Sequence, residues 1–207
     1  MNKLLVLDAD STLFNEEAID LLAALAGVQN QVSNITEAAM RGELDFAESL
    51  TQRVGFLKDS PANLIDAARN QLTLTEGAIE LISAARQRNC EVAIVSGGFA
   101  EIIEPLLISL GIHKYRANQL EIQDGVLSGH LVGAIVDRSA KANILKEFAR
   151  ELNLDLIDTI AVGDGANDIE MIETAGIGIA FCAKSALTKV ADVSINTRDL
   201  KLVIDYI

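Results

Sequence analysis

The chain has 207 residues, of which 50% are hydrophobic and only 4% aromatic, and its formal net charge is -13. This length is sufficient for a buried core with a smaller second domain, and the composition predicts that the core is aliphatic. The negative charge argues against a partner of nucleic acid, which needs a basic surface, and against binding to an anionic membrane.

The N-terminal segment combines a predicted strand with a dense polar stretch. Residues 4–7 form a continuous apolar run, which is typical of a strand buried on both faces. Asp8, Ala9, Asp10, Ser11 and Thr12 follow directly. A helix N-cap accounts for one such polar residue but not for the whole stretch, so we predict a functional site where this strand ends.

Neither the start of the chain nor its cysteines indicate export. The apolar run before Asp8 is too short for a signal peptide, and no apolar run approaches the length of a membrane span. Cys90 and Cys182 lie far apart and lack the spacing of metal ligands. We therefore expect a cytoplasmic protein with reduced thiols and no membrane partner.

Residues 15–72 read as a helical insert. Apolar spacing predicts helices at 16–26, 34–42 and 45–54, and a Ser-Pro start signal predicts a fourth at 60–71. No strand pattern interrupts them. We expect a small helical domain here, and a core made of residues 1–14 and 73–207.

From residue 73 onward, strands and helices alternate. Strands are predicted at 91–95, 159–162, 177–181 and 193–195, and helices at 78–88, 102–110, 141–152, 169–175, 185–190 and 199–207. Asp124-Gly125 lies between apolar runs and predicts a hairpin near 118–135. The alternation predicts an α/β fold, a Rossmann-like and mostly parallel sheet flanked by helices.

Polar residues follow three of the predicted buried strands, which puts them at one edge of a parallel sheet. If the strands are neighbours, this edge gathers four carboxylates, those of Asp8, Asp10, Asp164 and Asp168. Four carboxylates in one crevice cannot all stay ionised without a cation. Ligands that are all oxygen favour Mg²⁺.

The same edge contains groups that bind anions. We predict that Ser96-Gly97-Gly98 forms a turn before a helix, where a hydroxyl and free backbone N–H groups can hold a phosphate. Lys141 begins the helix after the hairpin and can reach the crevice, although on its own it is equally well a solvated surface lysine. His113 and His130 have no partner at triad or metal spacing and are interpreted as surface residues.

These residues resemble the four motifs of the haloacid dehalogenase superfamily. The motifs are Asp8-x-Asp10-Ser11-Thr12, Ser96-Gly97-Gly98-Phe99, Lys141, and the run from Gly163 to Asp168. The residues of these motifs, and those of the segment 16–53, are most similar to the sequences of the group that hydrolyses phosphoserine. The resemblance covers essentially the whole chain. Two positions differ from the residues that are common in the family: Ala9 stands where a larger residue is common, and Leu74 where proline is often found.

The resemblance implies a mechanism. Asp8 would be the nucleophile that forms an aspartyl-phosphate, and Asp10 the general acid and base. Mg²⁺ would be bound by Asp8, the Asp10 carbonyl and Asp164, with Asp168 ordering its water shell. The phosphate would be held by Ser96, Gly97, Lys141 and Asn167.

The resemblance also implies that the insert, residues 15–72, is a cap that selects the substrate. Glu17 would contact the ammonium of phosphoserine, Arg53 would contact its carboxylate, and Met40 and Phe46 would form an apolar wall. Without the resemblance, Glu17 and Arg53 read as helix-surface charges and Phe46 as a core residue.

Three alternatives remain open. One is a phosphotransferase, or a related small-phosphomonoester phosphatase, that uses the same residues with another acceptor or substrate. A second is a receiver domain with a phosphorylated Asp, although such a module is shorter and has no helical insert. The third is a metal-binding regulatory protein without turnover. The expected assembly is a monomer or homodimer.

Overall fold

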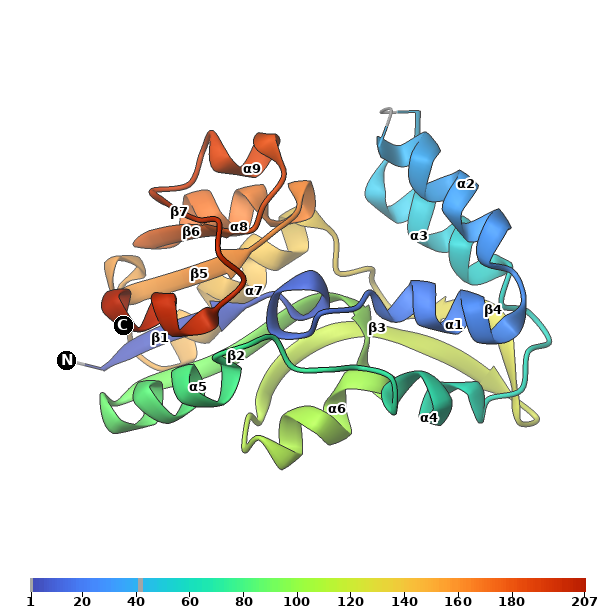
Figure 1. Ribbon diagram of the computed structural model, residues 1–207, viewed down its shortest axis with the longest axis horizontal. Coiled ribbons are helices and arrows are strands. Elements are labelled where there is room, and N and C mark those ends of the chain that lie inside the picture. Colours follow the sequence, from blue (N-terminus) through green and yellow to red (C-terminus); the bar gives the residue numbers. More distant parts are fainter. Residues whose placement is uncertain (1, 41–42) are drawn as a thin grey trace.

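The computed structural model describes residues 2–40 and 43–207. Their strands form a seven-stranded sheet in the order β4-β3-β2-β1-β5-β6-β7. All neighbours are parallel except β3 and β4. The strands are β1 (Lys3–Leu7), β2 (Cys90–Phe99), β3 (Lys114–Gln123), β4 (Val126–Val132), β5 (Thr159–Gly163), β6 (Ile177–Phe181) and β7 (Val193–Ile195). The predicted α/β fold with a mostly parallel sheet is confirmed (Figure 1).

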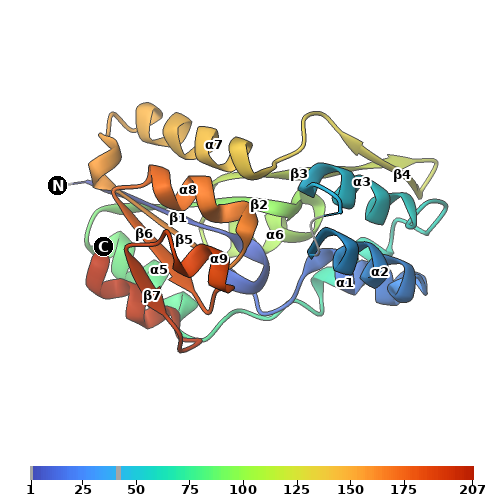
Figure 2. The same cartoon turned by 90° about the horizontal axis from the view of Figure 1, so that it is seen from above.

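Strand β1 lies in the middle of the sheet and is buried on both faces. Leu5 and Leu7 pack against α5 (Ala78–Gln87), α6 (Ala100–Ser109) and the C-terminal 3-10 helix η4 (Leu200–Tyr206). Leu4 and Val6 face α7 (Arg138–Glu151), α8 (Ile169–Thr174) and α9 (Ser185–Thr188). Figure 2 shows α7 and α8 on one side of the sheet and α5 on the other. The two helical layers explain why the run 4–7 has no polar residue.

Among the described residues, four α-helices lie between β1 and α5, beyond the carboxyl ends of the parallel strands (Figure 1). They are α1 (Ala18–Ala26), α2 (Gln29–Met40), α3 (Phe46–Gly55) and α4 (Leu64–Arg69). The segment leaves and re-enters the core at one point, where Phe14 and Leu74 form an antiparallel bridge and the Asn15 N–H donates to the Thr73 carbonyl at 3.0 Å.

Two helix starts in this segment differ from the predictions by four or five residues, whereas α1 and α3 begin within two residues of theirs. Helix α2 begins at Gln29, five residues early, and its predicted end at Arg41-Gly42 lies outside the described residues. Helix α4 begins only at Leu64. The reason lies in the backbone: the Asp59 and Ala62 N–H groups donate to the carbonyls of Leu127 and Gly125, which ties this stretch to β4. By contrast, α3 starts as predicted, with a capping box between Asp45 and Glu48.

The hairpin between β3 and β4 is confirmed. Asp124 and Gly125 have φ of 49° and 80°, the left-handed values that a two-residue hairpin turn requires. The last segment of the chain is a 3-10 helix, η4, and not an α-helix. His113 and His130 are exposed, as expected. Within the described ranges, no helix has the length and apolar character needed to cross a bilayer.

Candidate active site

Asp8 lies where β1 leaves the sheet. Its N–H donates to the Val162 carbonyl on neighbouring β5 at 2.9 Å, so the residue is fixed at the carboxyl edge. The chain then makes one π-helical turn, η1 (Ala9–Leu13), in which Ser11 has φ of 55°. The turn buries both carboxylates at the edge, leaving Asp8 3% and Asp10 8% exposed. The sequence predicted polar residues at this strand end but not the π turn.

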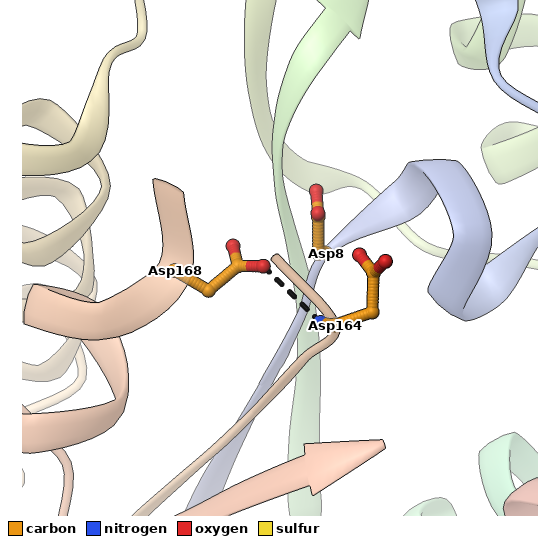
Figure 3. A group of neighbouring side chains, drawn as sticks. All are labelled: Asp8, Asp164 and Asp168. Atoms are coloured by element: carbon orange, nitrogen blue, oxygen red, sulfur yellow. Dashed lines mark hydrogen bonds between the residues drawn. The ribbon is translucent and has the colours of Figure 1, made fainter. Parts of the chain in front are cut away.

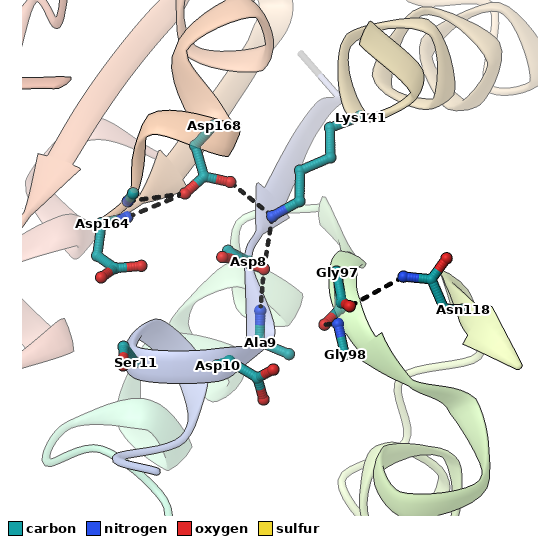
Figure 4. A network of polar contacts seen from close by, with 12 residues as sticks. Asp8, Ala9, Asp10, Ser11, Gly97, Gly98, Asn118, Lys141, Asp164 and Asp168 are labelled. Carbon is teal, nitrogen blue, oxygen red and sulfur yellow. Dashed lines mark hydrogen bonds and ion pairs between the residues drawn. The ribbon is translucent and has the colours of Figure 1, made fainter. Parts of the chain in front are cut away.

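Lys141 connects two of the predicted acidic residues. Its ammonium Nζ lies 2.8 Å from Asp8 Oδ1 and 2.6 Å from Asp168 Oδ1 (Figure 4). Burial opposes the charge of Lys141, but Asp168 and Asp8 raise its pKa above the ordinary value. The alternative of a solvated lysine is therefore wrong, because the side chain is fully buried. Lys141 lies one turn inside α7, which begins at Arg138 after its N-cap Asp137.

Asp8, Asp164 and Asp168 form an acidic cluster in which one carboxylate oxygen from each lies within 4.8 Å of the others (Figure 3). Burial, with the charge of Asp168, raises the pKa of Asp8 well above its usual range. Burial, followed by the charges of Asp168 and Glu17, raises the pKa of Asp164 to about 7. Ionising all three carboxylates would therefore place more negative charge in the cluster than the single ammonium of Lys141 balances.

The donor set fits a hard cation. Asp168 is occupied by protein partners: Oδ1 accepts from Lys141, and Oδ2 accepts the N–H groups of Asp164 and Gly165 at 3.2 and 3.0 Å. Asp8 and Asp164 each also offer a carboxylate oxygen to the cluster. Oxygen ligands of this kind suit Mg²⁺, Ca²⁺ or Mn²⁺ and not a soft metal, and a cation would offset the charge that raises their pKa values.

The stretch Ser96-Gly97-Gly98 is not the predicted turn. It extends β2 to Phe99, with an irregular register against β3 between Val95 and Phe99. Ser96 is fully buried, and its Oγ accepts the Gly98 N–H at 2.8 Å. The extension lies so close to Asp10 that a Cβ on Gly98 would come within 2.6 Å of Asp10 Oδ2. Only glycine leaves this space for the Asp10 carboxylate.

A cavity of about 270 Å³ opens between the sheet edge and the helices of the insert. It brings together eight of the predicted site residues: Asp8, Asp10, Glu17, Phe46, Arg53, Gly97, Asp164 and Asn167. Three others, Ser96, Lys141 and Asp168, are fully buried and are not among the lining residues. The side chain of Met40 lies outside the described residues.

Two opposite charges from the insert face this cavity. Glu17 accepts from Ser11 Oγ at 2.7 Å through Oε1, so the π turn holds its carboxylate. Arg53 donates through Nε to the Ser49 carbonyl at 3.3 Å. Burial lowers the pKa of Arg53, against the effect of Asp20 and Glu17, but a guanidinium stays charged in proteins. Arg53 is thus a cation placed inside a small cavity.

Three residues of the site were not predicted from the sequence. Asp20 lines the cavity, and burial raises its pKa. Its position three residues after Glu17 on a helix was a usable signal. Asn118 on β3 joins two site segments, because its amide donates to the Gly97 carbonyl at 2.9 Å and accepts the Val136 N–H at 2.8 Å. Lys184 also lines the cavity, and nothing in its neighbouring residues indicates this.

Residues 5–173 match the family model of the haloacid dehalogenase-like hydrolases. The chain belongs to this family of hydrolases, within which several of its relatives are phosphoserine phosphatases. One, from Methanocaldococcus jannaschii, is 45% identical over 99% of this chain and 97% of its own length. Another, from Lactococcus lactis, is 46% identical over 99% of this chain and 94% of its own.

One relative is longer than this chain. Phosphoserine phosphatase SerB2 of Mycobacterium tuberculosis is 53% identical over 94% of this chain, which spans only 47% of that protein. Solved structures agree with the family. A phospho-aspartyl intermediate analogue of phosphoserine phosphatase has 45% identity and a TM-score of 0.94, covering 100% of this chain and 99% of that one. A substrate-bound phosphoserine phosphatase complex has 44% identity and a TM-score of 0.95 with the same coverage.

Proposed function

We propose that this hydrolase converts O-phospho-L-serine to L-serine and phosphate with Mg²⁺, as the last step of serine biosynthesis. One observation carries the proposal: a single cavity of about 270 Å³ joins the carboxylates Asp8 and Asp10 to the opposite charges Glu17 and Arg53. The two carboxylates suit phosphoryl transfer. Glu17 and Arg53 suit the binding of a zwitterionic substrate, which carries both an ammonium and a carboxylate. The names of the relatives support the same substrate.

Asp8 acts as the nucleophile. The Ala9 N–H and Lys141 Nζ both lie 2.8 Å from its Oδ1, which fixes the direction of the carboxylate. It attacks phosphorus, the bond from phosphorus to the serine oxygen breaks, and an aspartyl-phosphate forms. Water then attacks this phosphorus, phosphate leaves and the Asp8 carboxylate is restored.

Asp10 moves the protons. Burial and the nearby charge of Glu17 raise its pKa well above the usual range, which favours the protonated form that a general acid needs. It gives this proton to the departing serine oxygen and later takes one from the attacking water. The Ala18 N–H donates to its Oδ1 at 3.4 Å, a contact that links the acid to the first helix of the insert.

Asp8, the Asp10 carbonyl and Asp164 would hold the Mg²⁺, with Asp168 positioning its water shell, and the ion would supply positive charge to the phosphoryl oxygens. Ser96, the Gly97 N–H, Lys141 and Asn167 bind the same oxygens as charge develops on them. The ammonium of the buried Lys141 also favours the ionised form of Asp8, against the burial and the charge of Asp168 that raise its pKa.

Residues 15–72 act as a cap on a core of residues 1–14 and 73–207. Glu17 contacts the substrate ammonium and Arg53 grips its carboxylate with a planar guanidinium. Phe46 contributes an apolar wall together with Met40. Its ring lies against Gly97, where a Cβ would come within 2.7 Å of Cζ. The protein works in the cytoplasm as a monomer or homodimer.

The decisive experiment measures phosphate release from a panel of small phosphomonoesters, with and without Mg²⁺. The expected result is metal-dependent release with the highest kcat/KM for phosphoserine. Asp8→Asn should abolish turnover while leaving the fold intact by circular dichroism; full activity in this variant would contradict the mechanism. Adding alcohols tests transfer, because a phosphotransferase would release serine in excess over free phosphate.

A further inference from the structure

Lys184 stands at the mouth of the active-site cavity. It lines the inner cavity of about 270 Å³ and also an outer one of about 690 Å³ that shares Arg53, Phe46 and Asn167 with it. Its N–H donates to the Asp164 carbonyl at 3.1 Å, so its backbone is fixed beside the acidic cluster. The residue is exposed, and no hydrogen bond or ion pair of its ammonium occurs within residues 2–40 and 43–207.

The inner cavity presents an electrostatic difficulty for an anionic substrate. Its acidic lining residues outnumber its basic ones: Asp8, Asp10, Glu17, Asp20 and Asp164 against Arg53 and Lys184. The whole chain carries a formal charge of -13, so a phosphate dianion is repelled at long range as well. Positive charge at the entrance therefore matters more here than in a neutral protein.

The other cations near the cavity already have partners. Lys141 is buried between Asp8 and Asp168. Arg138 lines the outer cavity, but its Nε lies 3.1 Å from Glu170 Oε1. Arg53 lies deeper and is half-buried near Asp20 and Glu17. Among the described lining residues, Lys184 is the cation that is exposed to solvent and has no salt-bridge partner, although its charge also acts on the nearby Asp164 carboxylate.

We propose that Lys184 captures the phosphate group of the incoming substrate and guides it from the outer cavity to Asp8. This inference rests on the proposed function, because it requires a phosphate monoester as the substrate. The role follows from position and charge: a flexible ammonium at the junction of two cavities attracts a dianion before the deeper groups can bind it. Lys184 is then a residue for substrate capture, whereas the proton and phosphoryl transfers belong to Asp8 and Asp10.

The test compares Lys184→Ala with Lys189→Ala in the metal-loaded protein. Both variants remove one exposed lysine next to the same short helix, but Lys189 lines neither cavity. Lys184→Ala should lower kcat/KM by roughly ten-fold at low ionic strength, the lower end of electrostatic steering effects. Its kcat should stay near wild type, and kcat/KM should depend less on salt. Lys184→Arg should restore most of the loss.

A second measurement does not need turnover. Inorganic phosphate, titrated calorimetrically into the Mg²⁺-loaded protein, should bind more weakly to Lys184→Ala than to wild type or Lys189→Ala. Equal affinities would overturn the inference, as would equal losses in both alanine variants. A fall in kcat with unchanged KM and salt dependence would also overturn it. If the wild type turns over another phosphomonoester but not phosphoserine, only the proposed substrate is wrong, and the Lys184 comparison is made with that ester.

Discussion

Lys141 Nζ lies 2.6 Å from Asp168 Oδ1, and both side chains are completely buried. The pair joins α7 to the N-terminus of α8, where Asp168 is the N-cap, and through Asp8 it also reaches the end of β1. A buried pair of this kind gains little over apolar residues as long as it is intact. Removing one partner is a different matter, because an uncompensated charge then remains in the interior.

Lys141→Met should therefore destabilise the protein by about 3–5 kcal/mol, the usual cost of breaking a buried ion pair. The measurement is urea unfolding of the metal-free protein, with Lys146→Met as the control because Lys146 is an exposed lysine on the same helix. Adding Asp168→Asn to Lys141→Met should recover part of the loss, but not all of it, since Asp8 stays unpaired. A Lys141→Met protein as stable as the Lys146→Met control would show that breaking the ion pair does not destabilise the fold.

Arg53→Ala should lower kcat/KM for phosphoserine much more than kcat/KM for an aryl phosphate. We expect kcat/KM for phosphoserine to fall roughly thirty-fold or more, which corresponds to about 2 kcal/mol for the loss of a buried charged contact. An aryl phosphate has no carboxylate for Arg53 to bind, so its kcat/KM should change little. Arg150→Ala, which removes an exposed arginine from α7, controls for the loss of net charge. Equal losses on both substrates would refute a role in substrate selection.

The acidic cluster should make the metal-free protein less stable as the pH rises. The pKa of Asp164 is raised to about 7, so between about pH 4 and pH 7 the folded state holds a proton that the unfolded state has released. Folding is then favoured at the acidic end of this range, and stability falls as the pH rises through 7. The raised pKa values of Asp8 and Asp10 act in the same direction.

The measurement is the Tm in EDTA between pH 5 and pH 8. Asp164→Asn should show a smaller fall in Tm over this range, and Mg²⁺ should oppose the fall in the wild type because the ion binds the ionised carboxylates. Asp155→Asn removes an exposed carboxylate outside the cavity and controls for the lost charge. A Tm that rises with pH in EDTA would contradict the electrostatics of the cluster.

Gly98→Ala should impair catalysis more than folding. The new Cβ would lie 2.6 Å from Asp10 Oδ2 and 3.1 Å from Ser96 Oγ, so the carboxylate must move. A displacement of about 1 Å at a catalytic group can cost on the order of 100-fold in rate. Gly55→Ala is the matched control, because its Cβ would meet nothing within 4 Å. Steady-state kinetics and thermal unfolding of both variants decide the question, and wild-type turnover by Gly98→Ala would mean that Asp10 is free to shift.

Local patterns in the sequence were sufficient for most of the core. The run 4–7 is apolar throughout because helices cover both faces of β1, and that pattern is readable without a structure. Asp124-Gly125 predicted the hairpin because left-handed backbone at both positions selects these residues. In the same way, the polar residues after three apolar runs indicated where the site lies.

Other features depend on contacts that no local pattern encodes. The late start of α4 reflects backbone hydrogen bonds to a hairpin more than sixty residues away in the chain. The extension of β2 through Ser96, Gly97 and Gly98 is a tertiary outcome as well, since two glycines in a row are typical of a turn. Lys184 and Asn118 have no distinctive neighbours, and only their places in space reveal them.

The chemical groups at each strand end can be predicted from the local sequence, because burial and turn geometry constrain residue type within a few positions. Which of those groups meet depends on the folded chain. Asp8 and Asp164 come together because β1 and β5 are neighbours in the sheet, with β2 on the other side of β1. Strand order is set by how the whole sheet packs, so the charge balance of the cavity, and the burial of Lys141 between two carboxylates, emerge only when the chain is folded.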